Sequence, residues 1–284
     1  MTKPFANGKQ GGWRRGIRDP LNEKLISRRL GARRRGTPVN PQLKDPRFFP
    51  KIRDQQDIGS CTGHGLRSAM AYKIRQRLDE KLSGKWGEQW DLSPLAMYYL
   101  GRMHEGLEFV PQDVGCIISL AVEAAKIYGI PTEESWPYDP AKFTRKPNKA
   151  AMQTGKWHQA CPSCYRLDED GDPHHTIDRI LQALENDLPI VYGFATYENI
   201  VDADVDGIVR PPKGAMDGGH CVDGFWANTK DKLLWGPNSW GNEIGGPALT
   251  GARYDERGYI GLPFQAIIDK QADDFWALEL ETVE

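Results

Sequence analysis

One cysteine of the chain stands at the predicted start of a helix, where its thiol can act as a nucleophile. Cys61 follows the turn-forming pair Gly59-Ser60, and apolar residues recur at three- and four-residue spacing after it. The helix dipole stabilises a thiolate there and lowers the pKa of the thiol. The free backbone N–H groups can receive an oxyanion, and Gln55, six residues upstream, can add an amide donor. Taken alone, such a cysteine is more often a small packed side chain.

A histidine and an asparagine further along have the residue types that a cysteine nucleophile needs. His220 opens a predicted strand after Gly219, and glycine lets the backbone and a substrate approach closely. Asn238 lies in a predicted turn, where its side-chain oxygen can accept from the imidazole N–H and fix the tautomer. The indole of Trp240 would shield that pair from water. Each residue also has an ordinary explanation, as a half-buried histidine or a turn residue.

Together, and in this order along the chain, these residues resemble the papain-like (C1) cysteine peptidases. The resemblance rests on Gln55, Gly59-Ser60-Cys61, Gly219-His220 and Asn238-Ser239-Trp240-Gly241. Further similar segments are Gly115, Gly129-Ile130, Trp136-Pro137-Tyr138 and Gly258-Tyr259-Ile260, the last similar to the family's final strand. The resemblance covers about residues 50–265, and the GSCT segment looks like the microbial branch.

The resemblance implies a cysteine endopeptidase that works through a thioester acyl-enzyme and needs no cofactor. Cys61, His220 and Asn238 would be catalytic, and the Cys61 N–H and Gln55 would form the oxyanion hole. Gly115, Cys116 and Gly219 would bind the substrate, which is a peptide or protein. Cys116 stands where the family often has a second glycine, so we expect its side chain to narrow or alter a substrate subsite.

The predicted elements that must position these residues indicate an α+β fold. The resemblance implies that this fold is papain-like and two-lobed, with the active site in the cleft. Residues 61–130 read as three helices, one starting at Ser93-Pro94 and one ending at Gly129. Residues 155–275 read mostly as strands, with one helix from Thr176 to Leu188. We therefore expect an arm over 1–50 and a peptidase domain over 51–284, with a helical lobe over about 51–150 and a β lobe over about 151–275.

The N-terminal segment differs sharply in charge from the remainder of the chain. Residues 1–53 hold 15 Lys and Arg but 3 Asp and Glu, whereas the whole chain has a net charge of −2. Such a basic arm can lie against its own body, dock on an acidic protein partner or assembly, or touch nucleic acid, the least favoured of the three. A solvated tail is the plainest alternative. A second hypothesis for function is a docking component of a larger assembly, such as a virus particle.

The five cysteines are odd in number and irregular in spacing, which favours reduced thiols over a disulfide framework. Cys161 and Cys164 form a CxxC segment, and with His174 and His175 they could supply four zinc ligands. A redox pair or a loop with two free thiols are the other interpretations. We expect no metal, with zinc at these four residues as the alternative.

Bulk composition excludes a membrane protein. No stretch of 18 or more apolar residues occurs, and the N-terminus has no apolar signal-peptide core. We therefore expect a protein without a signal peptide, located in the cytoplasm or packaged in a particle.

Overall fold

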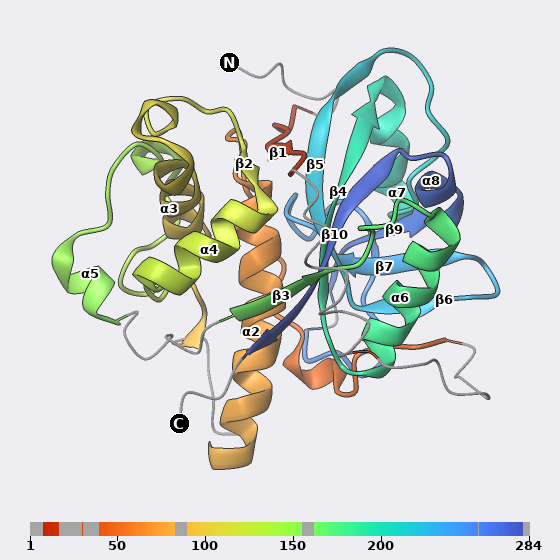
Figure 1. Ribbon diagram of the computed structural model, residues 1–284, viewed down its shortest axis with the longest axis horizontal. Helices are drawn as coiled ribbons and strands as arrows, with labels where there is room; N and C mark the ends of the chain where they lie inside the picture. The colour runs from red at the N-terminus through yellow and green to blue at the C-terminus, as the bar shows by residue number, and fades with distance from the viewer. Residues whose placement is uncertain are drawn as a thin grey trace.

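Helices form one side of the molecule and antiparallel sheets form the other (Figure 1). The computed structural model describes residues 8–16, 30, 40–82, 90–154, 162–254 and 256–280. The possible helix over residues 20–30 lies outside this range except for Leu30. The α+β class predicted from the sequence is confirmed, and the lobe boundaries stay a prediction.

Three long helices build the helical side, as predicted for residues 61–130. They are α2 (Cys61–Leu82), α3 (Pro94–Glu105) and α4 (Ile118–Tyr128). Ser93 caps α3, because its hydroxyl accepts a hydrogen bond of 3.1 Å from the N–H of Ala96. Gly129 ends α4 with φ +70°, a conformation that favours glycine. Shorter helices on this side are η3 (Leu107–Phe109), η4 (Pro140–Lys142) and α5 (Lys149–Thr154), whereas Phe48 of η1 (Pro46–Phe48) belongs to the hydrophobic cluster of the sheets.

Two four-stranded sheets build the other side. The first has the order β3 (Pro162–Arg166), β10 (Ala272–Leu280), β4 (Ile190–Tyr197), β5 (Met216–Gly224). The second has the order β6 (Trp226–Asn228), β7 (Leu233–Pro237), β9 (Arg257–Pro263), β8 (Gly246–Pro247). The helical segments here are α6 (Pro173–Glu185), η6 (Glu198–Asp202), α7 (Ala203–Asp206) and α8 (Phe264–Ile268). Gly258-Tyr259-Ile260 lies in β9 and is not the final strand, because β10 follows it.

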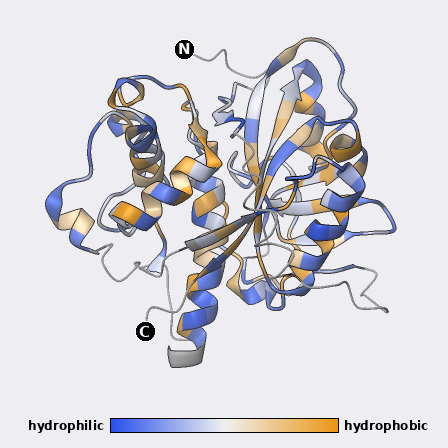
Figure 2. Cartoon of the chain, in the orientation of Figure 1, coloured by the Kyte–Doolittle hydropathy of each residue, from blue (hydrophilic) through white to orange (hydrophobic). Residues whose placement is uncertain are grey.

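The helix α2 packs against the first sheet, so the two sides share buried surface. Its apolar residues belong to a hydrophobic cluster that also contains Val191 of β4, Cys221 of β5 and Trp276 of β10. A second cluster fills the space around the two sheets and α6. Figure 2 shows hydrophobic and hydrophilic residues interspersed along the strands and helices, and mostly hydrophilic colours on the outer loops. Among the described residues no helix is long and apolar enough to cross a membrane.

The described part of the N-terminal arm lies against the chain's own body. Its strand β1 (Trp13–Arg14) pairs in parallel with β2 (Cys116–Ile117) on the helical side. In Figure 1 β1 runs between β2 and β5. Of the arrangements considered for the basic arm, packing on its own body is therefore confirmed for residues 8–16.

Candidate active site

Cys61 is the first residue of α2, as the sequence predicted, but its environment differs from the expected one. The side chain is fully buried, and burial raises the pKa of the thiol to about 11. Backbone N–H groups of Cys221, Gly12 and Thr62 act in the opposite direction and are outweighed. The expected low pKa is therefore absent in this state, because the helix terminus is covered and dry.

His220 and Asn238 meet as the sequence predicted. The Nε2–H of His220 on β5 donates a hydrogen bond of 2.8 Å to Oδ1 of Asn238. That oxygen also accepts from the N–H of Ser239 at 2.8 Å, which fixes the orientation of the amide. The indole of Trp240 stacks on the imidazole with ring centroids 4.4 Å apart. Burial lowers the pKa of His220 to about 4, and the bond to Asn238 offsets part of this effect.

The strand β5 brings the histidine to the cysteine. Cys221 follows His220 in β5, and its backbone N–H is near enough to the thiol of Cys61 to lower the pKa of that thiol. Because α2 packs on β5, the first turn of the helix and this point of the strand lie together. Two segments about 160 residues apart in sequence thus form one site.

Gln55 is buried beside the nucleophile and already holds a carbonyl group. Its Nε2 donates to the backbone carbonyls of Gln10 and Ile58, each at 2.9 Å. Its Oε1 accepts from the hydroxyl of Ser239 at 2.6 Å, which orients the amide. The carbonyl of Gln10 belongs to the arm, so the arm engages the amide donor that we expected to bind an oxyanion.

Gly12 of the arm is held between the two sides of the cleft. Its carbonyl accepts from the N–H of Cys116 at 2.7 Å, and its N–H donates to the carbonyl of Gly219 at 3.0 Å. A Cβ atom on Gly12 would overlap the carbonyl of Gly59, so only glycine fits here. Cys116 and Gly219 were both expected to bind substrate backbone, and here they bind the arm. Gly115 contributes its carbonyl, which accepts from the guanidinium of Arg14 at 3.4 Å.

The expectation that Cys116 narrows a subsite is wrong. Its side chain is fully buried and lies against Gly101 of α3, where an added Cβ would come within 2.5 Å of the sulfur. Glycine at position 101 makes room for the thiol, which therefore points away from the arm and into the helical side.

Trp13 of the arm fills a pocket in the wall of the cleft. Its indole lies over Gly193 of β4 and Gly219 of β5, where a Cβ at either glycine would overlap the ring. The indole N–H donates to Oδ2 of Asp274 at 3.1 Å. A hollow of about 660 Å³ adjoins Trp13, with Tyr197 and Met216 among its lining residues.

Sequence reasoning missed three residues of this site, namely Gly12, Trp13 and Asp274. The Gly11-Gly12-Trp13 segment was a weak signal, because it interrupts an otherwise basic arm. Asp274 carries no local signal, since it is one of two adjacent aspartates at the start of β10.

The four proposed zinc ligands are only partly described. Cys161 lies outside the described residues, and Cys164 pairs with Leu278 in the first sheet. His174 and His175 lie in the exposed first turn of α6, where Nδ1 of His175 is 3.0 Å from an oxygen of Asp170. Within the described ranges no group of three or more His, Cys, Asp or Glu residues could hold a metal ion.

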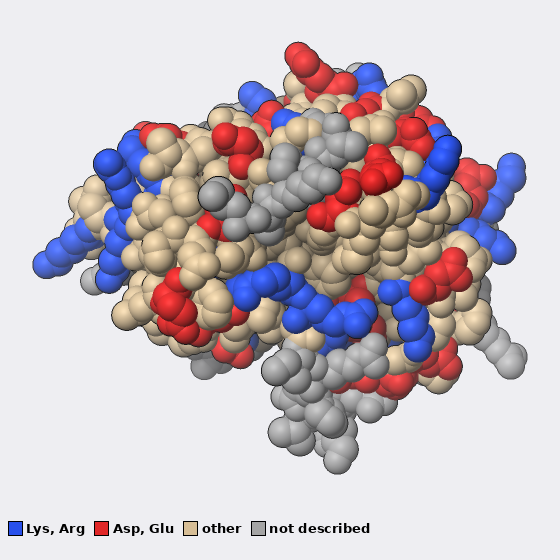
Figure 3. Space-filling model, turned by 90° about the horizontal axis from the view of Figure 1, so that it is seen from above, with Lys and Arg blue, Asp and Glu red and all other residues tan. Residues whose placement is uncertain are grey.

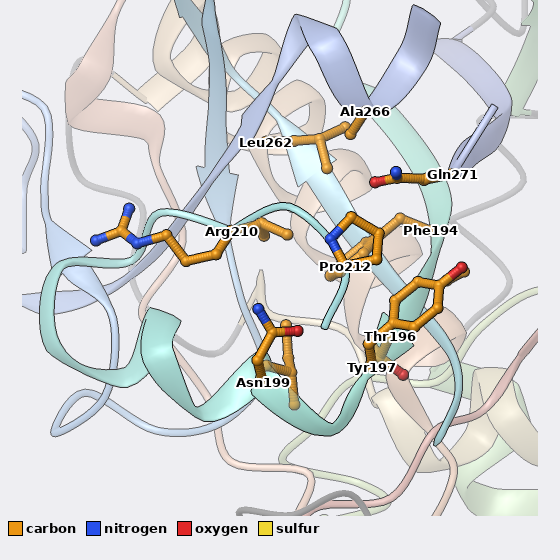
Figure 4. A pocket seen from close by; sticks show the side chains of 12 residues that line it. Phe194, Thr196, Tyr197, Asn199, Arg210, Pro212, Leu262, Ala266 and Gln271 are labelled. Carbon is orange, nitrogen blue, oxygen red and sulfur yellow. The ribbon is translucent and has the colours of Figure 1, made fainter. Parts of the chain in front are cut away.

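A second hollow lies beside β4 and is too small for a substrate. Figure 4 shows Phe194 and Pro212 next to each other at this hollow, with Leu262 on one side and Asn199 and Tyr197 on the other. Its free volume is about 10 Å³, roughly the space of one water molecule. None of its lining residues is a His, Cys, Asp or Glu.

Comparisons with known proteins show similarity in sequence and in fold. No family model matches the chain. An uncharacterized peptidase C1-like protein of Acanthamoeba polyphaga mimivirus is 31% identical over 234 residues, which cover 80% of this chain and 68% of that protein. The crystal structure of xylellain, a cysteine protease from Xylella fastidiosa, has a TM-score of 0.73 at 24% identity and covers 99% of both chains. For procathepsin B S9 from Trypanosoma congolense the TM-score is 0.60 at 16% identity, over 98% of this chain and 88% of the other.

Proposed function

The chain belongs to the peptidase C1-like, papain-like family, and we propose that it is a cysteine endopeptidase that cleaves peptide bonds through a thioester acyl-enzyme. One observation carries this proposal. The imidazole of His220 is oriented by Asn238 and covered by Trp240. The N–H of the next residue, Cys221, is near enough to the thiol of Cys61 to act on its pKa.

The hydrogen bonds of the site suggest a role for each residue in the reaction. His220 takes the proton of the Cys61 thiol through Nδ1, because Nε2–H is held by Asn238. The thiolate attacks the carbonyl carbon of a peptide bond, and the N–H of Cys61 and the amide of Gln55 bind the oxyanion. The imidazolium gives its proton to the leaving amine, which leaves a thioester on Cys61. Water activated by His220 hydrolyses this thioester and regenerates the thiol.

We further propose that the structure with the arm in the cleft is latent. Near neutral pH the thiol of Cys61, with a pKa of about 11, and the imidazole of His220, with a pKa of about 4, are both uncharged. Gly12 and the carbonyl of Gln10 occupy the positions that a substrate needs. Once the arm leaves, water reaches both groups, and the thiolate–imidazolium pair can form.

The experiment uses the full chain and two matched substitutions in the arm. Gly12→Asn places a side chain against the carbonyl of Gly59 and expels the arm from the cleft. Gly8→Asn is the control, because nothing lies within 4 Å of an added Cβ and asparagine tolerates the φ of +78°. Hydrolysis of a mixed pool of fluorogenic peptides should rise at least about tenfold in Gly12→Asn relative to Gly8→Asn, the effect of roughly 1.4 kcal/mol in arm binding.

A second substitution assigns the nucleophile. In the Gly12→Asn chain, Cys61→Ser should abolish hydrolysis, whereas Cys164→Ser, on β3, should keep it. Hydrolysis that survives Cys61→Ser, or is absent from the open chain although the protein is folded, would refute the proposal.

The expectations about a docking partner and about the location of the protein have less support. Engagement of residues 8–16 with the cleft disfavours a role of this segment as a docking tail for an acidic partner. The viral source of the 31% identical relative supports packaging in a particle, and a cytoplasmic location stays the alternative.

A further inference from the structure

The loop that carries Gln55 is held partly by the arm. Nζ of Lys9 lies 2.7 Å from Oδ1 of Asp54, the residue before this glutamine. The side-chain amide of Gln55 donates to the carbonyl of Gln10. Figure 3 shows basic side chains in the middle of the face seen from above, with acidic ones around them. Departure of the arm removes both contacts of the loop, so other contacts must keep the amide of Gln55 beside Cys61.

The backbone of this loop is strained one residue after Gln55. Gln56 has a φ of +56°, a left-handed conformation that residues with a side chain rarely adopt. Its N–H donates to Oδ1 of Asp54 at 2.8 Å, the oxygen that also faces Lys9. A relaxed backbone would turn the peptide plane between Gln55 and Gln56 and move the side chain of Gln55. A partner of the Gln55 carbonyl is therefore needed to hold that plane.

Tyr138 supplies this partner. Its hydroxyl donates to the backbone carbonyl of Gln55 at 2.6 Å and lies 2.7 Å from Oγ of Ser60, the residue before Cys61. A carbonyl oxygen only accepts, so the single proton of the tyrosine hydroxyl points to Gln55, and the hydroxyl of Ser60 donates to the tyrosine oxygen. One phenol oxygen thus joins the loop of the amide donor to the turn of the nucleophile.

Both Tyr138 and Ser60 are themselves held in place. The N–H of Tyr138 donates to Oε1 of Glu133 at 3.0 Å. The Nδ1–H of His64, one turn along α2, donates to the carbonyl of Ser60 at 3.1 Å. The imidazole of His64 also packs edge-on against the ring of Tyr138, with centroids 4.8 Å apart. Burial lowers the pKa of His64 to about 3, so near neutral pH this support is uncharged and does not change.

We propose that Tyr138 is the positioning residue of the oxyanion hole, because its hydroxyl keeps the amide of Gln55 in a fixed place relative to the N–H of Cys61 once the arm has left. Tyr138 takes no part in the proposed proton transfers, and it acts on the reaction through Gln55. Its effect falls on the transition state, where charge develops on the oxygen between the two donors. This inference rests on the proposed function for its meaning in catalysis.

Steady-state kinetics of the opened chain test this role. The parent is the full chain with Gly12→Asn, and Tyr138→Phe removes one oxygen atom from it. We expect kcat for peptide hydrolysis to fall about tenfold, which corresponds to roughly 1.4 kcal/mol, with KM within about threefold of the parent. Tyr72→Phe is the matched control, because this buried hydroxyl donates to Asp187 at 2.5 Å and lies about three turns of α2 away from Cys61. It should leave both values unchanged.

Two further measurements separate positioning from a general loss of structure. In a chain that also has Gln55→Ala, adding Tyr138→Phe should change kcat by less than about threefold, because the residue through which the tyrosine acts is gone. Alkylation of Cys61 by iodoacetamide forms no oxyanion, so its rate should be the same in Tyr138→Phe as in the parent. A full loss of kcat in the Gln55→Ala background, or a parallel loss of alkylation, would overturn the inference.

NMR of the side-chain amide of Gln55 tests the inference without requiring catalysis. The amide N–H signals of Gln55 in the isotopically labelled Gly12→Asn chain are assigned by their absence in Gln55→Ala. Tyr138→Phe should shift or broaden these signals, whereas Tyr72→Phe should not. Signals that Tyr138→Phe leaves unchanged would overturn the inference, whatever the activity of the chain. Signals that change as expected in a chain without Cys61-dependent hydrolysis would refute the peptidase proposal alone.

Discussion

The side-chain amide of Gln55 donates a hydrogen bond of 2.9 Å to the backbone carbonyl of Gln10. The donor expected to stabilise a reaction intermediate is thus occupied by the protein's own chain, 45 residues upstream. Gly12 of the same arm also lies near enough to Cys61 to act on the pKa of its thiol, which burial raises. The residues expected to be catalytic and the arm segment that lies against them therefore belong to one network of contacts.

Gln55→Ala should lower kcat about 100- to 1,000-fold in the Gly12→Asn chain, the cost of removing one donor from an oxyanion hole. KM should change little, because the donor acts mainly on the charge of the transition state. Gln265→Ala, on α8 and exposed, is the matched control. Steady-state kinetics that show a Gln55→Ala kcat within about threefold of the parent would exclude Gln55 from the oxyanion hole.

Asn238→Ala should lower kcat roughly 10- to 100-fold, because the acceptor that holds the ring of His220 is lost. Asn238 also raises the pKa of this histidine, so its removal should shift the titration of His220 to lower pH. NMR titration of the full chain measures the shift in the pKa of His220. Steady-state kinetics of the Gly12→Asn chain measure the change in kcat. Asn242→Ala, at an exposed neighbouring position, should change neither quantity.

Asp91→Asn should destabilise the fold by about 3–5 kcal/mol, because it leaves the buried guanidinium of Arg67 without its partner. Burial alone would raise the pKa of Asp91, but Arg67 and Arg53 lower it to about 2, from 3.8. The contribution of this carboxylate to stability, roughly 2 kcal/mol, is present above pH 4 and is lost as the pH falls through 2.

Urea unfolding at several pH values measures this effect. The difference in unfolding free energy between the parent and Asp91→Asn should shrink from pH 4 to pH 2. A difference that stays constant over this range would show that the ionisation of Asp91 does not contribute to stability. Asp231→Asn, at the exposed turn, serves as the control for a change in net charge.

Local patterns were sufficient to predict the parts of the site that lie within one element. The Gly59-Ser60 turn and the apolar spacing after it placed Cys61 at the start of α2. The roles assigned to His220 and Asn238 came from their resemblance to the family, and their contact at 2.8 Å agrees with it. Short patterns also indicated β4, β7 and β9, because these are apolar runs between turn residues, but they did not indicate β3 or β10.

Contacts across long stretches of sequence could not be predicted. Nothing near Gly12 indicates that it lies between Cys116 and Gly219. The direction of the Cys116 side chain depends on Gly101, which makes room for it in α3. The pKa of Cys61 depends on whether the arm covers it, and this is a property of the assembled molecule.

The most direct test of the account is the pH dependence of alkylation at Cys61 by iodoacetamide, read by peptide mapping in the full chain, in Gly12→Asn and in Gly12→Asn with His220→Ala. The full chain should react slowly at neutral pH and faster as the pH approaches 11. The Gly12→Asn chain should react fast well below pH 8.5, about the pKa of a free thiol, and this reactivity should disappear with His220→Ala. Reaction of the opened chain that follows an ordinary thiol, or fast reaction of the full chain at pH 6, would contradict a cysteine–histidine pair masked by the arm.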